Sequence, residues 1–244
     1  MSWLSYTDKL DMQNFDPVIS ETSGILGEQA GLSFDTLLRA TLVAGGTKDY
    51  TGNAAARASL AVATDKANYG DFIGAIAILE AANALPSDGS GYCAITHPYV
   101  FAQLMQDATF VALFTREGGE SIRTGKAGSI FNCKIYVTSN APSYADGGAA
   151  NADVYDIMYI GGEAYGIAGM GNTVPNMAGD GGEMFGTSNT GKAPHPVEII
   201  VKGLGETGLD PLNQRGTIGW KATYDAQILN SAWIVDQETV TMYG

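Results

Sequence analysis

The closest approach to a catalytic motif in this sequence is the segment GTSNTGKA at Gly186–Ala193. It falls one residue short of the phosphate-binding loop GxxxxGK[ST], in which the last hydroxyl binds Mg²⁺. Ala193 has no hydroxyl, and Pro194 and Pro196 prevent the helix whose N-terminus would face the phosphates. Gly169–Gly171 fails as a dinucleotide loop because no helix follows it. We therefore expect neither a nucleotide nor another cofactor to bind.

Two histidines are present, and a hydrolytic triad or a zinc site would normally use at least one of them. His97 stands directly before Pro98 at a helix entrance, where a capping or packing role is expected. His195 lies between two prolines, and no serine sits in a GxSxG motif. These residues predict neither a catalytic site nor a metal site, so we expect the protein not to be an enzyme.

Acidic and sulfur-containing residues offer two further candidates. Three acidic residues in the middle of the chain lack the spacing of a calcium loop: Asp146, Asp153 and Asp156. Whether the DGGE segment at Asp180–Glu183 binds a surface calcium ion stays open. Cys93 and Cys133 lie 40 residues apart with no CxxC motif or nearby histidine pair, so they predict free, buried thiols.

The composition favours a protein whose surface is largely covered. Of the 244 residues, 45% are hydrophobic and only 16% are charged, and there are 32 glycines. An average chain has about 25% charged residues and about 7% glycine. Little charge and many small residues suit a subunit covered by copies of itself, although an apolar enzyme would fit as well.

Charge and hydropathy argue against two classes of partner. Thirteen basic and 26 acidic residues give a net charge of −13, which is spread along the chain. Phosphate binding needs clustered Lys and Arg, so we expect no nucleic-acid binding. No apolar window reaches the roughly 18 residues of a membrane span. The N-terminus MSWLSYTDKLD also lacks the layout of a signal peptide, so we expect no membrane attachment and a cytosolic product.

A long helix is predicted over residues 16–44. Asp16-Pro17 is a strong helix start and Gly45-Gly46 a strong stop, and the apolar residues between them recur largely at steps of three and four. Three glycines inside this helix each destabilise it by about 1 kcal/mol relative to alanine: Gly24, Gly27 and Gly31. Either the helix breaks near Ser33, or another backbone packs closely against the glycines.

The rest of the chain alternates between short helices, strands and loops. Helices are expected at Asp71 to Ala84 and Pro98 to Asp107, and strands at 92–96, 134–138, 154–160, 197–202, 216–228 and 233–242. Residues 50–69 form an Ala-rich connection, and residues 161–191, with ten glycines in 31 positions, a long loop. This order predicts an α+β protein with a middle region inserted into a two-part base.

Three groups of segments carry a resemblance to a known family. The first is Thr7–Gly46 (TDKLDMQNFDPV and the long helix), and the second is Ala94–Val100 (AITHPYV). The third runs from Pro196–Lys202 (PVEIIVK) through Asp210–Ala222 (DPLNQRGTIGWKA) to Ile228–Trp233 (ILNSAW). Together, and in this order, they resemble the N4-type family of tailed-phage major capsid proteins.

The resemblance implies an HK97-like capsid fold of the α+β class, with a long spine helix, an antiparallel peripheral sheet and an inserted mixed α/β axial domain. The domains would be 1–69 and 197–244 (peripheral, spine helix about 16–44) and 70–196 (axial, with the Gly-rich loop 161–191). Trp220 and Trp233 are expected to be buried in the peripheral sheet, because each sits in a strand pattern with apolar partners.

The function that the resemblance implies is that of a major capsid protein, which self-assembles into pentamers and hexamers of an icosahedral phage shell around double-stranded DNA. Its partners would be itself and scaffolding, portal or decoration proteins, and the DNA would be enclosed without specific binding. It would lie in the virion capsid after assembly in the host bacterial cytoplasm. An encapsulin-like compartment is the alternative within the fold. A small soluble nucleotide-binding or hydrolytic enzyme is the alternative outside it.

Six residues are candidates for contacts between subunits. An arginine can hold a carboxylate of the next subunit with two hydrogen bonds, and a helix glycine allows another backbone to approach. The candidates are Arg215, Arg39, Arg57, Arg116, Arg123 and Gly27, and Arg215 is favoured because it lies in the family-like DPLNQRG segment. Members of the family usually carry an N-terminal arm and an extended hairpin before the TDKL segment. Here Met1 lies six residues before Thr7, so the chain is either truncated or latches its neighbours by other means.

Overall fold

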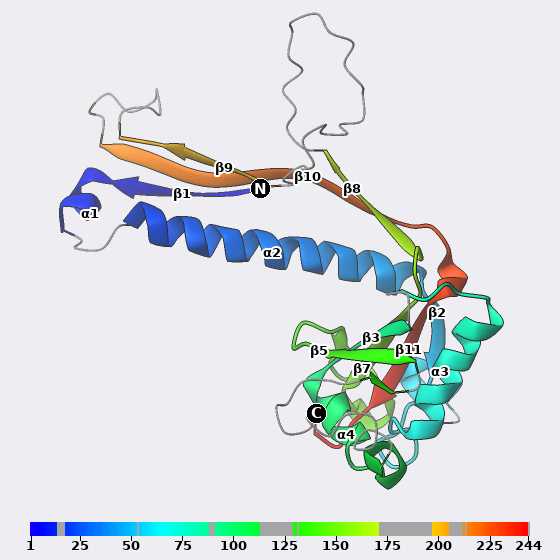
Figure 1. The fold of residues 1–244 in the computed structure, drawn as a ribbon. Coiled ribbons are helices and arrows are strands. Elements are labelled where there is room, and N and C mark those ends of the chain that lie inside the picture. The colour runs from blue at the N-terminus through cyan, green and yellow to red at the C-terminus, as the bar shows by residue number, and fades with distance from the viewer. Residues whose placement is uncertain are drawn as a thin grey trace, which may run out of the picture. The chain divides into compact units, whose positions relative to one another are not determined.

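The long helix α2 is unbroken in the computed structural model, which describes all residues except 14–17, 53, 88–90, 113–128, 131, 171–196, 205–211, 213 and 244 (Figure 1). α2 runs over Val18–Gly45 and confirms the predicted helix. Ser33 does not interrupt it, and its hydroxyl donates to the Gln29 carbonyl at 2.8 Å within the helix. A Cβ built at any of the three helix glycines would meet nothing within 4 Å. Among the described residues of one subunit, the expected close approach of another backbone is therefore wrong.

The chain divides into two compact units, each built from two segments. Unit 1 comprises Met1–Leu38 and Ile167–Ala226, and unit 2 comprises Arg39–Gly166 and Gln227–Gly244. The chain thus passes between the units at 38/39, 166/167 and 226/227, whereas the sequence predicts boundaries at 69/70 and 196/197. None of the helices that the structure describes has the length and apolar character needed to cross a membrane.

Unit 1 contains most of a four-stranded sheet. Its strands are β1 (Ser2–Thr7), β8 (Tyr165–Met170), β9 (Val197–Lys202) and β10 (Arg215–Ile228), and the short α1 (Asp8–Gln13) follows β1. β10 pairs antiparallel with β1 and with β9, and it also pairs with β8. β9 and β10 confirm two predicted strands. β8 corrects the prediction that residues 161–191 lack regular structure, since pairing with β10 supplies its hydrogen bonds.

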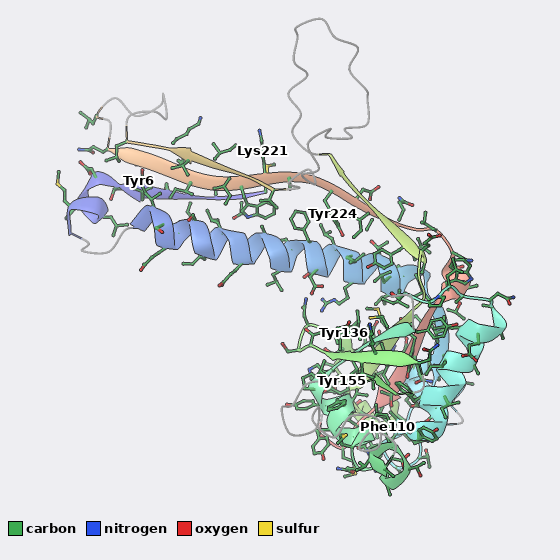
Figure 2. The ribbon with its side chains drawn as sticks, in the orientation of Figure 1. Tyr6, Phe110, Tyr136, Tyr155, Lys221 and Tyr224 are labelled. Carbon is green, nitrogen blue, oxygen red and sulfur yellow. The ribbon has the colours of Figure 1, made fainter. Side chains whose placement is uncertain are left out.

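The core of unit 1 lies between α2 and the sheet. Residues of α2 at steps of four pack on side chains that alternate along β10, and the buried members are Leu26, Ala30, Ile218 and Trp220, together with Tyr6 of β1. The Phe34 ring contacts the Tyr224 ring in a tilted arrangement, at 4.8 Å between centroids. Figure 2 shows Tyr224 on β10. Tyr6 needs Gly216 opposite it in the register, because a Cβ at this position would lie 2.3 Å from the tyrosine ring. Trp220 is buried here, which confirms that prediction.

Unit 2 is built on a seven-stranded mixed sheet in the order β2-β11-β7-β3-β5-β4, with β6 also paired to β7. The strands are β2 (Thr47–Tyr50), β3 (Tyr92–Thr96), β4 (Ser129–Ile130), β5 (Cys133–Val137), β6 (Ser143–Tyr144), β7 (Val154–Ile160) and β11 (Ile234–Val240). Its helices include α3 (Tyr69–Ala81) and α4 (Pro98–Leu104), and residues 108–112 are also helical. Short 3-10 turns are η1 (Arg57–Ser59), η2 (Ala149–Asn151) and η3 (Ser231–Trp233). Strands β3, β5 and β7 and helices α3 and α4 confirm predicted elements.

The last strand corrects the expected peripheral sheet. β11 does not join β9 and β10; it pairs antiparallel with β7 and parallel with β2. All seven of its residues are buried, and only a central strand covered on both faces provides such burial. Trp233 consequently lies in unit 2, half-buried against that unit's core, where its Nε1 donates to the Ala82 carbonyl at 3.1 Å. The prediction that Trp233 is buried in the peripheral sheet is wrong.

The two faces of the unit 2 sheet are covered differently. One face packs against α3 and α4 in an apolar core that includes Phe72, Phe110 and Tyr159. Phe72 meets the other two rings at 5.5 and 5.8 Å between centroids. The opposite face carries a smaller apolar cluster of Leu60, Val154 and Val240. Alternation along β7 and β11 places three acidic side chains on this second face.

Candidate functional site

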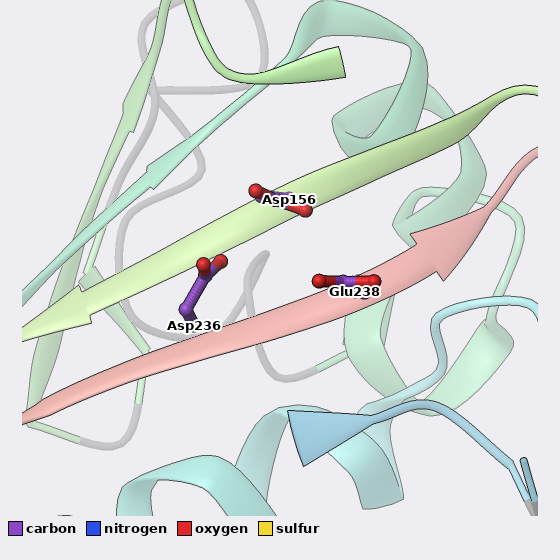
Figure 3. Close-up of side chains that lie close together, drawn as sticks. All are labelled: Asp156, Asp236 and Glu238. Atoms are coloured by element: carbon purple, nitrogen blue, oxygen red, sulfur yellow. The ribbon is translucent and has the colours of Figure 1, made fainter. Parts of the chain in front are cut away.

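The three acidic side chains of the second face form the most densely charged group that the described residues contain. Asp236 and Glu238 come from β11, and Asp156 comes from β7, where it stands directly opposite Glu238 in the antiparallel register. Each offers an oxygen within 4.8 Å of the others, and all three are buried (Figure 3). We call Asp156, Asp236 and Glu238 the carboxylate cluster.

Two basic side chains reach the carboxylate cluster from neighbouring elements. Lys48 of β2 contacts Asp236 and lies 3.1 Å from Glu238. Arg57 of η1 donates from Nε and Nη2 to the two carboxylate oxygens of Glu238, both at 2.6 Å. The Arg57 guanidinium also lies over the Tyr144 ring, 3.5 Å from its centroid. The side chains of Lys48 and Arg57 are 32% and 34% exposed, so solvent reaches the basic groups of the network but not the buried carboxylates.

The pKa values within the cluster shift in opposite directions. Burial, followed by the charge of Asp236, raises the pKa of Asp156 to about 8, although the Tyr144 hydroxyl donates to Asp156 Oδ2 at 2.9 Å. Burial also raises the pKa of Asp236, despite its contact with Lys48. Burial acts to raise the pKa of Glu238 too, but hydrogen bonds from its two basic partners outweigh this effect and lower it.

These groups form an ion-pair network in which Lys48 and Arg57 pair with Asp236 and Glu238. Carboxylate oxygens at this spacing also occur in metal sites, but here Lys48 and Arg57 supply the positive charge. Covalent catalysis would need an activated nucleophile, and the hydroxyl that contacts the cluster belongs to Tyr144, whose pKa burial raises. The network therefore ties β2, β7, β11 and η1 together through charge.

The sequence did not reveal this cluster. Asp156 attracts attention only as part of a failed calcium loop, while Asp236 and Glu238 look like solvent-facing positions of an alternating strand. The usable signal is the polar run DQET inside the strand IVDQETV. Alternation puts two of its members on each face, so one polar pair must enter the protein if both faces are covered.

His97 and the cysteines occupy structural positions. His97 caps α4, as predicted: its Nδ1 accepts a hydrogen bond from the Tyr99 backbone N–H at 3.2 Å. The imidazole stacks on Tyr155 at 4.8 Å, and burial lowers its pKa. Both cysteines are free; Cys133 is buried and Cys93 half-buried. Burial raises the pKa of Cys133 to about 12, which keeps this thiol protonated and unreactive.

Several sequence candidates lie outside the described residues. They are the near phosphate loop Gly186–Ala193, His195 and the possible calcium segment Asp180–Glu183. Gly169, the first glycine of the segment that fails as a dinucleotide loop, belongs to β8. The three acidic residues of the middle region do not come together in one site. The Asp146 backbone N–H donates to the Asp153 carboxylate at 3.0 Å, whereas Asp156 lies in the carboxylate cluster.

The candidates for contacts between subunits differ in their surroundings. Arg57 bonds Glu238 of its own chain, and Arg39 donates to the backbone and side-chain oxygens of Asn140 at 2.5 and 3.0 Å. Arg215 is exposed at the start of β10, in register with Thr7. Gly27 lies on an open part of α2. Arg116 and Arg123 lie outside the described residues.

Unit 1 exposes several large apolar side chains, which we call together the unit 1 apolar surface. They are Trp3 of β1, Ile25 and Leu32 of α2, and Ile199 and Val201 of β9, with exposed fractions between 46% and 69%. They lie on more than one face: Trp3 is in register with Gly219, whereas Ile199 is in register with Trp220 on the opposite face of the sheet. Single exposed apolar residues are normal on a monomer. Five large apolar side chains exposed on the helix and two strands of one small unit instead favour faces that other protein covers. The low charge of the chain agrees with this interpretation.

Comparison of the sequence with known proteins gives one family. The profile of a family described as phage capsid protein matches residues 2–235, which is nearly the whole chain. No curated protein matches the chain.

Comparison of the fold gives proteins of the same kind. The chain is similar to the acidic stable capsid of Helicobacter pylori bacteriophage KHP30, with a TM-score of 0.64, 13% identity, and 98% of this chain and 74% of that chain covered. It is also similar to the capsid of the cyanophage P-SCSP1u, with a TM-score of 0.62, 14% identity and coverage of 98% and 71%. The holo-SrpI encapsulin complex from Synechococcus elongatus PCC 7942 follows, with a TM-score of 0.54, 12% identity and coverage of 100% and 74%. These likenesses show an HK97-like fold.

Proposed function

Because the chain belongs to the phage capsid protein family, we propose that its copies form the pentamers and hexamers of an icosahedral shell around double-stranded DNA. The chain is a structural, major capsid protein with an HK97-like fold. A closed shell requires every copy to present several surfaces to its neighbours, because each interface repeats under the symmetry.

The unit 1 apolar surface is the observation that carries this proposal. Full burial of one large apolar side chain contributes about 1.5–3 kcal/mol. Five such residues on two strands and one helix therefore provide a driving force for association that a free monomer would not need. Arg215 lies on the same unit and is exposed, so we keep it as the favoured polar contact between subunits.

The division of labour between the units is part of the proposal. Unit 1, with α2 and its sheet, would be the peripheral domain, and unit 2, with the mixed sheet, would be the axial domain near the capsomer axis. This assignment moves the limits of the domains from 69/70 and 196/197 to the limits of the two units, and it moves β11 into the axial domain.

The charge of the chain supports a shell that encloses DNA without binding it. With a net charge of −13 per copy, the inner wall would repel phosphates unless basic residues gather there. The protein would thus lie in the virion capsid after assembly in the host cytoplasm. Its partners would be further copies and scaffolding, portal or decoration proteins, and it would have no enzymatic activity of its own.

A second candidate is a protein compartment without DNA. The fold similarity to the SrpI encapsulin complex favours it specifically. The two candidates share the fold and the apolar surface, so they differ in contents and not in subunit geometry. Particles formed in phage-infected cells would contain nuclease-protected DNA if the protein is a capsid protein, and no protected DNA if it forms a compartment.

Size-exclusion chromatography with light scattering tests the class of function. A shell subunit should elute as capsomers or as particles of megadalton mass. Replacing Ile25 and Leu32 together by Ser should shift it toward the monomer, because the apolar driving force is reduced. A small soluble enzyme should elute as a monomer or small oligomer in both forms. Saturable ATP binding that Lys192→Ala abolishes would likewise favour the enzyme and contradict the proposal.

A further inference from the structure

The carboxylate cluster is one positive charge short of neutrality. Three ionised carboxylates carry three negative charges, whereas Lys48 and Arg57 supply two positive ones. Asp156, Asp236 and Glu238 are all at most 1% exposed, so water does not screen the excess charge. An uncompensated buried charge destabilises a fold by several kcal/mol. The folded chain should therefore take up one more positive charge at this place.

Two oxygen atoms mark where that charge belongs. Oδ2 of Asp156 accepts a hydrogen bond from Tyr144, and Oδ2 of Asp236 contacts Lys48. The other oxygen of each residue, Oδ1, is buried and has no hydrogen-bond partner. Two carboxylate oxygens cannot bond each other while both are acceptors, but a proton on one of them turns it into a donor.

We propose that the folded subunit retains one proton between Asp156 and Asp236, and that unfolding releases it. The proton makes the cluster electrically neutral, and on either Oδ1 it turns a buried acceptor without a partner into a donor beside a second carboxylate, since the carboxylates lie within 4.8 Å of one another. A metal ion would fit less well. Hard cations such as Ca²⁺ take about six to eight oxygen ligands, and both oxygens of Glu238 are already bonded to Arg57. This inference concerns the single subunit and does not depend on the proposed shell.

The pKa shifts of the facing groups agree with the proposal. Burial raises the pKa of Asp156 to about 8 and also raises that of Asp236. The other charged and titratable groups that face them are Lys48 from β2, Arg57 from η1, Tyr144 from β6 and Glu238 from β11. Between about pH 5 and pH 8 Lys48, Arg57 and Tyr144 keep their charge state, since the pKa of each is raised. The lowered pKa of Glu238 keeps it ionised in the same range.

The retained proton links stability to pH with a definite sign. In the unfolded chain Asp156 has an ordinary pKa of about 3.9, whereas in the folded chain it is about 8. Between these values the folded state holds a proton that the unfolded state has lost, so the free energy of unfolding falls as pH rises. Above about pH 8 the cluster carries its uncompensated charge, and the contact between β7 and β11 is weakest there. The pair thus makes the subunit pH-sensitive.

Urea unfolding of the full chain between pH 5 and pH 8 tests the proposal. Release of one proton predicts that the ratio of the parent's unfolding constant to that of Asp156→Asn rises about tenfold per pH unit. His97, whose pKa burial lowers, contributes equally to both proteins and cancels in this ratio. Asp156→Asn places an amide donor beside Asp236 without a titratable proton, so it releases no such proton on unfolding. Asp146→Asn is the matched control: Asp146 is exposed, carries the same charge, and lies in the same unit. This control should keep the full pH dependence of the parent.

Three results would overturn the proposal. The first is a parent whose unfolding constant rises no faster with pH than that of Asp156→Asn, and the second is an Asp146→Asn control that loses the pH dependence as Asp156→Asn does. The third is a pH dependence that added Ca²⁺ or Mg²⁺ removes and EDTA restores, because a metal would then hold the site. If Asp156→Asn does not fold, infrared spectra of the parent with ¹³C-labelled aspartate replace it. The band of a protonated carboxyl should be present at pH 6 and lost at pH 9, and its absence at pH 6 would contradict the proposal.

Discussion

Arg57 donates two hydrogen bonds of 2.6 Å to Glu238 of its own chain. The sequence alone predicts Arg57 as a contact between subunits, on the argument that a scarce arginine needs a carboxylate partner. The argument about pairing holds, but the partner is internal. Arg39 is likewise occupied by Asn140 of the same unit. Among the arginines that the structure describes, Arg39 and Arg57 thus bond partners within the subunit, whereas Arg215 is exposed.

Replacing Arg57 by Ala should destabilise the subunit by about 2 kcal/mol. Removing one partner of a buried pair costs about 3–5 kcal/mol, and the value is lower here because Arg57 is one-third exposed and Lys48 still neutralises Glu238. Arg57→Lys should fall between parent and alanine variant, because it keeps the charge and loses the two-point contact. Urea denaturation measures all three. Equal stability of Arg57→Ala and the parent would show that the pair contributes nothing.

Replacing Gly27 by Ala should stabilise the isolated subunit by up to about 1 kcal/mol. The position lies in the interior of α2, and a Cβ there meets nothing within 4 Å. Gly74 of α3 has equally open surroundings, so Gly74→Ala is the matched control for helix propensity. Thermal unfolding compares both with the parent. A Gly27→Ala subunit less stable than the parent would contradict the open geometry.

Gly27→Leu distinguishes an effect on the folding of the subunit from an effect on its assembly. The larger side chain has room within the subunit, so the variant should fold normally. If another copy covers this part of α2, light scattering should show reduced assembly of the folded variant, because the added volume overpacks the contact. Normal assembly of Gly27→Leu would remove Gly27 from the candidates for subunit contacts.

Replacing Tyr144 by Phe should destabilise the protein more at pH 9 than at pH 6. The hydroxyl donates to Asp156 at 2.9 Å and lowers that residue's pKa, so its removal should raise the pKa above about 8. The lost hydrogen bond is stronger when Asp156 is ionised, which it is only at high pH. The aromatic ring under Arg57 is kept. Tyr92→Phe, which removes a bond to the Ala84 carbonyl, should show no such pH dependence. If Tyr144→Phe loses the same stability at both pH values, Asp156 does not change from protonated to ionised between pH 6 and pH 9.

Much of the fold follows from local patterns. β7 and β9 lie at the predicted residues 154–160 and 197–202, because β-branched and aromatic residues bounded by turn signals specify short strands. α2 follows from its start and stop signals. β2 was missed because TKDY has neither alternation nor apolar content, and β8 was missed because its glycines resemble a loop. Both strands owe their hydrogen bonds to partners far along the chain.

The candidate site was not predictable in the same way. The position of β11 in the unit 2 sheet depends on pairing with β7 and β2, which no local pattern of IVDQETV encodes. Once this pairing exists, Glu238 lies opposite Asp156, and the two acidic residues need positive partners from elsewhere. Lys48 and Arg57 come from segments more than 180 residues earlier than Glu238. Charge pairing over such separations is a tertiary property.

Replacing Arg215 by Ala should reduce assembly without changing the stability of the subunit. Arg215 is exposed, so its loss should alter the free energy of unfolding by less than about 0.5 kcal/mol. With −13 charges per copy, salt screens repulsion over about 8 Å at physiological ionic strength and should promote assembly of the parent. Light scattering across a salt series should show lower assembly of the variant at each concentration. Assembly equal to the parent throughout would make Arg215 an ordinary surface residue.

Electron microscopy of the purified, folded chain in negative stain tests the central claim most directly, because it reports the assembly without a label or a partner. The account predicts closed shells, or rings of five and six subunits, formed by this chain through its covered apolar surface. Uniform small particles of one or two subunits, under conditions in which the chain is folded and salt screens its charge, would contradict the assignment as a self-assembling shell protein.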